Sequence, residues 1–247
     1  MNYLEKIIPQ VKETVDSGYY VHASRERKSL VEKIEEEKEK KVVPLIAEIK
    51  PASPREGKII GKEEMEEIAR EYVEGGASAL SILTEPKDFL GDILFLQREW
   101  KIPVLMKDFV IDKRQIGSGD AVLLIQKLLD LCHIEADELI DAAHEEGMET
   151  LLEVHDVYEF EKAKKTETDI IGINNRNLET MEIDLENTCK ILKEVKSDRL
   201  VISESGISSA EDVRRLISAG ADAVLVGTSL LKCKDRKGRI GEMRGAR

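Results

Sequence analysis

Eight short apolar runs recur along the chain from residue 43 onward, and each one ends in polar residues. Continuous runs of this length are typical of strands that are buried on both faces, as in a parallel sheet covered by helices. The runs occupy 43–50, 79–85, 103–109, 121–127, 150–156, 169–176, 199–206 and 223–229. We therefore expect eight parallel strands.

Longer stretches with apolar residues at helical spacing lie between these runs. Several of them end in a glycine just before the next run, as in AGADAVL at 219–225, which fits the left-handed residue that ends many helices. We expect helices at 63–74, 91–99, 134–146, 157–165, 185–195 and 209–219. The alternation of strand and helix predicts the α/β class and a single (β/α)8 TIM barrel over residues 43–247.

The two ends of the chain and one connection depart from this repeat. Two helical stretches, 2–16 and 26–40, precede the first run, so residues 1–42 are expected to be a helical extension that packs on the barrel or closes its lower end. Only residues 108–120 separate the third and fourth runs, and a parallel crossover needs about a dozen residues, so we expect a shortened third helix. The end KCKDRKGRIGEMRGAR is basic and glycine-rich without an amphipathic stripe, which predicts a weak eighth helix or a frayed tail.

Composition narrows the class of protein further. The 247 residues match the size of one closed barrel, and the net charge of −12 argues against a general affinity for nucleic acid. Cys132, Cys189 and Cys233 lie far apart without the spacing of a metal site, which indicates free thiols in a reducing compartment. No apolar run approaches the ~20 residues that a membrane-spanning helix needs. We expect a cytoplasmic protein that binds neither membrane nor metal.

Polar residues end each apolar run, and in such barrels the active site lies at the carboxyl ends of the strands. Charged groups at the ends of apolar strands are costly to bury unless they are paired or used. The residues in these positions are Glu48, Lys50, Ser81, Lys107, Glu153, Asn174, Arg176, Glu204, Ser205, Gly206, Gly227, Thr228 and Ser229. Two lysines and three glutamates in this set favour a catalytic pocket over a collection of ordinary loop residues.

Two of the strand ends suggest a site for phosphate. SESGIS and VGTSLL each place a glycine beside small hydroxyl residues where a strand turns toward a helix. Backbone N–H groups at such turns bind anions, and the loops after the last two strands commonly hold phosphate in barrel enzymes. The segment KPASPREGK at 50–58 is a basic loop that can bring cations over an acidic substrate.

These motifs together resemble those of the indole-3-glycerol-phosphate synthase family. AEIKPASPREG is similar to the family signature AE-x-K-x-x-SPS-x-G, and SILTE, LMKDF, LLEVHD, GINNRNLET, SESGI and VGTSL follow in the family's order. The resemblance covers about residues 42–231. LMKDF together with GINNRNLET is the most specific part.

The resemblance implies the substrate 1-(2-carboxyphenylamino)-1-deoxyribulose 5-phosphate, which loses carbon dioxide and water to give indole-3-glycerol phosphate without metal or organic cofactor. It also implies that Lys107 is the general acid that protonates the ribulose carbonyl oxygen and that Glu153 is the general base or its carboxylate partner. Lys50, beside Glu48, corresponds to the lysine that contacts the substrate carboxylate and assists the dehydration. The other implied positions are Asn174 and Arg176 for orienting the substrate; Ser81, Phe89, Phe109 and Glu204 for the pocket; and Ser53, Ser205, Gly206, Gly227 and Thr228 for phosphate.

The sequence does not determine whether the pKa of Lys107 is raised or lowered. A free lysine has a pKa near ~10.4 and is a sluggish acid at neutral pH. A second lysine nearby and partial burial would lower the pKa of Lys107, whereas adjacent glutamates would raise it. Of the four histidines, His155 alone stands at a strand end, and we interpret it as a loop or hydrogen-bonded residue rather than a catalytic one.

Two other functions remain possible at this point. A different phosphate-binding barrel, such as phosphoribosylanthranilate isomerase, would be expected to use a cysteine and an aspartate at strand ends, and no cysteine ends an early strand here. A catalytically silent barrel that binds a partner would tolerate the loss of strand-end charges, yet Lys50, Lys107 and Glu153 are all present. We expect a monomeric enzyme whose only partner is a small phosphorylated substrate.

Overall fold

The computed structural model describes residues 3–22, 26–178 and 180–246, and within them eight parallel strands form a closed barrel. Each strand pairs with its neighbours in the chain, and the last strand pairs with the first. The strands are β1 (Leu45–Ile49), β4 (Ala79–Leu83), β5 (Val104–Lys107), β6 (Ala121–Ile125), β7 (Glu149–Val154), β8 (Ile170–Asn174), β9 (Leu200–Glu204) and β10 (Ala223–Val226). Each of the eight predicted runs contains one strand, so the predicted barrel is confirmed.

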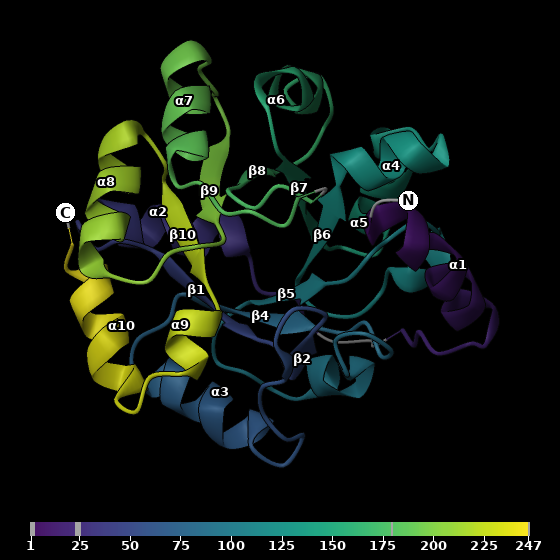
Figure 1. Ribbon diagram of the computed structural model, residues 1–247, viewed down its shortest axis with the longest axis horizontal. Coiled ribbons are helices and arrows are strands. Elements are labelled where there is room, and N and C mark those ends of the chain that lie inside the picture. Colours follow the sequence, from purple (N-terminus) through teal and green to yellow (C-terminus); the bar gives the residue numbers. More distant parts are fainter. Residues whose placement is uncertain (1–2, 23–25, 179, 247) are drawn as a thin grey trace.

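Helices surround the strands (Figure 1). They are α3 (Met65–Glu74), η1 (Ile93–Gln97), η2 (Lys113–Gln115), α4 (Gln126–Cys132), α5 (Ala136–Glu145), α6 (Val157–Ala163), α7 (Glu186–Glu194), α8 (Ala210–Ala219), α9 (Thr228–Leu231) and α10 (Arg236–Arg244). Five of the six predicted helices form as α-helices, and the sixth, at 91–99, forms only the 3₁₀ helix η1. Helix α4 was not predicted, because the buried Leu128 and Leu129 continue the apolar run of β6 and hide its end.

The apolar side chains of the strands divide between two cores. Inward-facing residues such as Ile46, Leu105, Leu123 and Leu225 fill the inside of the barrel. Their neighbours along the strands pack outward against the surrounding helices. Burial on both faces explains why the strands appear in the sequence as continuous apolar runs rather than as alternating ones.

The connection between β5 and β6, the third in the barrel, contains only a very short helix, as predicted. Its only helical piece is the three-residue 3₁₀ helix η2, which begins with a capping box between Asp112 and Gln115. The buried side chain of Gln115 accepts hydrogen bonds from the backbone N–H groups of Ile111 and Asp112 and donates one to the carbonyl of Phe109. These bonds anchor the loop that directly follows Lys107.

The prediction of a frayed tail is wrong, because the chain after β10 forms two short helices. Helix α10 follows the short helix α9, and its side chains Ile240 and Met243 are fully buried against the barrel and its neighbours. Arg236 and Arg244 also pair with acidic residues of α3 and of the N-terminal extension. Two buried apolar residues three positions apart are enough to seat a short helix, although they are too few to stand out among the charges and glycines of this segment.

Ile240 gives a test of this correction. Replacing it with alanine removes a fully buried side chain, and we expect the free energy of unfolding to fall by about 2–5 kcal/mol. Urea unfolding followed by circular dichroism measures it. The control is Gly241→Ala on the same helix, where an added Cβ meets no atom within 4 Å, and stability there should hold or rise. A loss below about 1 kcal/mol for Ile240→Ala would mean that α10 is not docked.

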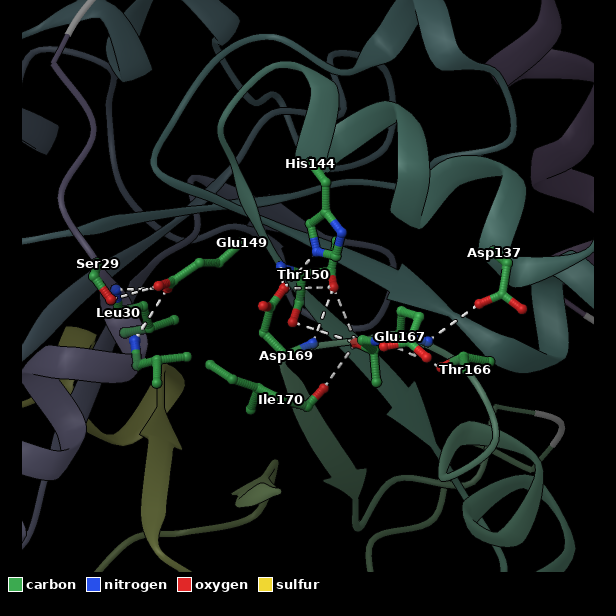
Figure 2. Close-up of polar contacts among 12 residues, drawn as sticks. Ser29, Leu30, Asp137, His144, Glu149, Thr150, Thr166, Glu167, Asp169 and Ile170 are labelled. Atoms are coloured by element: carbon green, nitrogen blue, oxygen red, sulfur yellow. Dashed lines mark hydrogen bonds and ion pairs between the residues drawn. The ribbon is translucent and has the colours of Figure 1, made fainter. Parts of the chain in front are cut away.

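Helix α2 (Leu30–Glu39) lies across the amino-terminal end of the barrel and closes it. Figure 2 shows its start, where the carboxylate of Glu149, the first residue of β7, accepts hydrogen bonds from the hydroxyl of Ser29 and from the backbone N–H of Leu30 at 2.7 Å. At the other end of α2, Lys38 pairs with Asp222, just before β10, at 2.8 Å. The helix is thus tied to two strands on different sides of the barrel.

Helix α1 (Tyr3–Asp16) packs near the opposite, carboxyl-terminal end of the barrel. Its buried side chains Leu4, Ile7 and Val11 belong to the same apolar cluster as Phe109. Tyr3 packs edge-on against the ring of Phe109, with 5.9 Å between ring centroids. Residue 2, which the sequence placed in this helix, lies outside the described residues.

Candidate active site

A cavity of about 480 Å³ opens at the carboxyl ends of the strands. Fourteen of the sixteen residues singled out from the sequence line it: Glu48, Lys50, Ser53, Phe89, Lys107, Phe109, Glu153, Asn174, Arg176, Ser205, Gly206, Gly227, Thr228 and Ser229. The two that do not are Ser81 and Glu204, and both are fully buried behind the lining.

Lys107 lies at the centre of a cluster of carboxylates. Its Nζ is 2.7 Å from Oε2 of Glu204, 3.7 Å from Oε2 of Glu153 and 3.8 Å from Oε2 of Glu48. Glu48 in turn accepts a hydrogen bond of 2.6 Å from Nζ of Lys50. These five side chains come from β5, β7, β9 and β1 and the residue just after β1, so the barrel brings together the charges that the sequence placed at separate strand ends.

The carboxylates decide the ionisation of Lys107, which the sequence left open. Burial alone would lower the pKa of this ammonium, but the negative charges of Glu204, Glu153 and Glu48 outweigh burial and raise the pKa above its usual value. Lys107 is therefore protonated at neutral pH. The pKa of Glu48 moves the opposite way: burial opposes its ionisation, but the ammonium groups of Lys50 and Lys107 lower its pKa.

The two other carboxyl groups around Lys107 titrate far apart. Burial and repulsion by Glu153 raise the pKa of Glu204 to about 7, although Lys107 acts against both. Burial also acts on Glu153, but contacts with His155, Lys107 and the amide of Asn174 prevail and lower its pKa to about 2. Pairs of carboxyl groups separated in this way are typical of sites that transfer protons.

Glu204 reaches Lys107 because a glycine stands next to it. A Cβ added to Gly172, on the neighbouring strand β8, would overlap Oε1 of Glu204 and Cδ2 of Leu151. Glu204 consequently contacts Lys107 from behind the residues that line the cavity, and it does not itself line the cavity.

Gly172→Ala should therefore disturb catalysis without touching a lining residue. We expect the displaced carboxylate of Glu204 to draw Lys107 out of position and to lower kcat by up to about 10²-fold, since shifts near 1 Å can have that effect. Steady-state kinetics checks this, with Gly241→Ala as the same exchange at a position free of contacts. An unchanged kcat in folded Gly172→Ala would rule out this positioning effect.

Asn174 and Arg176 follow one another at the end of β8. The side-chain oxygen of Asn174 accepts a hydrogen bond of 2.9 Å from the backbone N–H of Arg176. The guanidinium of Arg176 donates to the carbonyl of Met181 at 3.3 Å and faces the cavity. Burial and repulsion by Arg55, which also lines the cavity, lower the pKa of Arg176. Two guanidinium groups that line one cavity and repel each other favour an anionic ligand.

The two loops predicted to hold phosphate lie side by side. After β9, Ser205 and Gly206 adopt left-handed backbone angles, with φ of 67° and 83°. A Cβ on Gly206 would also overlap Ile183, so this turn requires glycine. The hydroxyl of Ser229, in α9, donates to the carbonyl of Ile207 at 2.8 Å and ties the turn after β10 to the turn after β9. Both turns face the cavity.

The opposite side of the cavity is apolar. The rings of Phe89 and Phe109 pack with centroids 5.8 Å apart, and Tyr3 adds a third ring. Such a wall suits a flat aromatic group. Sequence reasoning missed several other lining residues, namely Tyr3, Met181, Ile183 and Lys232. They lie on helices and loops away from the strand ends, and no motif in the sequence distinguishes them.

Residues 3–22, 26–178 and 180–246 contain neither a cluster of metal-binding side chains nor a helix that could span a membrane. No group of three or more histidine, cysteine, aspartate or glutamate side chains there is placed to hold a metal ion. Likewise, no helix in the described ranges has the length and apolar character required to cross a membrane.

Solved structures with low sequence identity share the fold. An N-acetylmannosamine-6-phosphate 2-epimerase from Clostridium perfringens superposes with a TM-score of 0.59 at 15% identity, over 85% of this chain and 93% of that one. A thiamine phosphate pyrophosphorylase from Pyrococcus furiosus gives a TM-score of 0.55 at 17% identity, over 83% and 95%. At these identities the likeness concerns the barrel architecture alone.

Sequence comparisons are far more specific. The family model for indole-3-glycerol phosphate synthase matches residues 3–243. Curated relatives with that name include one from Acetivibrio thermocellus, 41% identical over 82% of this chain and 80% of the relative, and one from Methanopyrus kandleri, 42% identical over 78% and 79%. One from Bacillus thuringiensis is 40% identical over 92% of both chains. The chain belongs to the indole-3-glycerol phosphate synthase family.

Proposed function

We propose that this chain is an active indole-3-glycerol phosphate synthase, a carboxy-lyase of tryptophan biosynthesis. It converts 1-(2-carboxyphenylamino)-1-deoxyribulose 5-phosphate into indole-3-glycerol phosphate, carbon dioxide and water. The observation that carries the proposal is the placement of Lys107: a protonated lysine among three carboxylates, in a cavity that also has an apolar wall and two phosphate-type turns.

In this proposal Lys107 drives the ring closure. The ring carbon that bears the carboxylate attacks the ribulose carbonyl carbon, and negative charge develops on the carbonyl oxygen. A positioned ammonium stabilises that charge and transfers a proton to the oxygen. The raised pKa of Lys107 ensures that the proton is present at neutral pH, and a substrate that displaces a glutamate from the cluster would make the ammonium more acidic.

Decarboxylation follows from the cation formed by ring closure. The electron pair of the bond to the departing carboxylate moves toward the iminium nitrogen, so the substrate supplies its own electron sink and no cofactor is required. Lys50 is proposed to contact the substrate carboxylate before it leaves, and the carboxylate of Glu48 holds this lysine at 2.6 Å.

The final dehydration needs an acid for the departing hydroxyl and a base for a ring proton. We assign the acid to Lys50 and the base to Glu153, which lies on the other side of Lys107 and is ionised at neutral pH. A carboxylate with so low a pKa is a weak base as long as it is paired with Lys107 and His155. Contact with a substrate that displaces Lys107 would strengthen it.

The remaining residues bind and orient the substrate in this proposal. Ser53 and the turns at 205–206 and 227–228 hold the phosphate, and Phe89 and Phe109 flank the aromatic ring. Asn174 and Arg176 orient the substrate from the end of β8, while Ser81 and Glu204 act from behind the lining.

Residues 43–247 form the catalytic barrel and residues 1–42 its helical extension in this proposal, both within one domain. The interior cluster shared by α1, α2 and the strands supports the single domain. We further propose that the enzyme works as a cytoplasmic monomer.

An assay of the purified protein tests the function directly. Indole-3-glycerol phosphate is fluorescent as an indole, so its appearance from the carboxyphenylamino substrate can be followed continuously. Turnover of phosphoribosylanthranilate instead would identify an isomerase, and binding of either compound without turnover would identify a silent barrel. Among the cavity-lining residues that the structure describes there is no cysteine, which disfavours the isomerase.

A further inference from the structure

His155 bridges two glutamates directly behind the cavity. It follows β7, two residues after Glu153, and its Nε2 lies 3.3 Å from Oε1 of Glu153. On the other side its Nδ1 lies 3.0 Å from Oε2 of Glu159 in α6. The contact with Glu153 is short enough for an ion pair but lies off the angle of a good hydrogen bond.

The surroundings of His155 favour its charged form. The side chain is 10% exposed, and Glu153 and Glu159 are the titratable groups in direct contact with it. The amide of Asn187, in α7, is neutral and donates to the backbone carbonyl of His155 at 3.0 Å. Lys107 is a cation on the far side of Glu153. Burial would lower the pKa of the imidazole, but the two carboxylates prevail and raise it to about 9.

Glu159 fixes where the imidazole lies. The same oxygen, Oε2, accepts from the backbone N–H of His155 at 2.8 Å and contacts the ring nitrogen. The backbone N–H of Glu159 is in turn capped by the side chain of Asp156 at 2.8 Å. A histidine anchored at its backbone, its ring and the start of the following helix has little freedom to move away from Glu153.

We propose that His155 is a positioning residue for the reaction: its imidazolium, held by Glu159, keeps the carboxylate of Glu153 ionised and aimed into the cavity. The inference rests on the role proposed for Glu153 and adds to it. His155 does not line the cavity, so it acts on the substrate only through Glu153. Without it Glu153 would be a buried carboxylate whose one remaining cation, Lys107, lies 3.7 Å away and is shared with two other glutamates.

The first experiment measures the charge of His155 and needs no activity. A pH titration of the histidine ring signals by NMR, with His155→Gln to assign the resonance, should show one histidine with a pKa near 9. In Glu159→Gln, which removes one of its two carboxylates, that pKa should fall. A value for His155 at or below about 6.5, the usual figure for histidine, would overturn the proposal.

The second experiment follows the effect on Glu153 through the pH profile of kcat/KM. His155→Gln removes a positive charge and thereby stabilises the protonated carboxyl, so the acidic limb should move up by about 1–3 pH units. We expect kcat at neutral pH to fall about tenfold, since a misdirected carboxylate loses orientation, while KM changes less than threefold. Glu159→Gln should shift the limb in the same direction by a smaller amount.

His144→Gln is the matched control. His144 pairs with Asp169 at 2.9 Å at the other end of the barrel (Figure 2), so the same exchange there should leave the pH profile unchanged. If His155→Gln lowers stability yet keeps the acidic limb of the unmodified protein, the residue is structural only and the proposal is wrong.

The two experiments also separate this inference from the proposed function. If the purified protein makes no indole-3-glycerol phosphate but the NMR titration shows the raised pKa of His155, the proposed function is wrong, whereas the ion pairs of His155 with Glu153 and Glu159 are confirmed. If turnover is normal and the titration shows a neutral His155, the role proposed for His155 is wrong and the proposed function is confirmed.

Discussion

Replacing Lys107 by alanine is expected to lower kcat by about 10³-fold or more, since general acid–base groups contribute roughly 10²–10⁴-fold and this lysine also stabilises the developing oxyanion. Measuring product fluorescence under saturating substrate checks this. Lys107 pairs with Glu48, Glu153 and Glu204, and the proposed phosphate site consists of other residues, so the Kd for inorganic phosphate, measured by calorimetry, should stay within about threefold. A near-normal kcat would refute the assignment of Lys107 as the acid.

The fold should survive this substitution in spite of the three glutamates around Lys107. A buried carboxyl group that loses its cation takes up a proton rather than remaining charged, and Glu204, with a pKa already at about 7, does so most readily. We therefore expect a moderate loss of thermal stability that is largest at alkaline pH. Lys107→Arg is the companion variant, because it keeps the charge but alters the geometry of the donor.

Replacing Glu153 by glutamine should lower kcat by about 10²–10⁴-fold. The change removes the proposed base, and it also removes the carboxylate shared by Lys107 and His155. The amide retains nearly the same shape, so lost charge rather than lost packing accounts for the effect. Product formation under single-turnover conditions measures the chemical step. A loss below tenfold would place the base elsewhere, and Glu48 would be the next candidate.

Glu149→Gln is the control for this variant. Glu149 is the first residue of the same strand, β7, and its carboxylate accepts hydrogen bonds at the start of α2 instead of facing the cavity (Figure 2). The same exchange at opposite ends of one strand should therefore leave kcat unchanged at Glu149 and reduce it strongly at Glu153. A comparable fall in both variants would point to a general weakening of β7.

The barrel could be predicted from the sequence because strands buried on both faces leave continuous apolar runs. Strand β1 illustrates this: Ile46 points into the barrel, Leu45 points outward, and both are apolar. The strand ends were visible for the same reason, since a charged Lys107 or Glu153 interrupts the run where the strand reaches the cavity. The order of apolar and charged residues along the chain is therefore enough to locate the strands and their ends.

The C-terminal helix and helix α4 show where local chemistry is insufficient. α10 depends on two buried side chains, Ile240 and Met243, and on ion pairs with residues far away in the chain. The start of α4 is hidden because its apolar residues belong to the same core as the strand before it. The docking of α10 thus depends on contacts between distant segments, whereas the boundary between β6 and α4 lies inside one continuous apolar run. Periodicity in a short window records neither.

The sequence by itself determined the eight strands and the residues that end them, and its motifs indicated the family. Only the tertiary structure decided how these charges act on one another. It placed three carboxylates around Lys107, withdrew Glu204 and Ser81 behind the lining, and set His155 between Glu153 and Glu159. The reason is physical: a pKa and a hydrogen bond depend on distances of a few ångströms between residues as many as 156 positions apart, as Glu48 and Glu204 are.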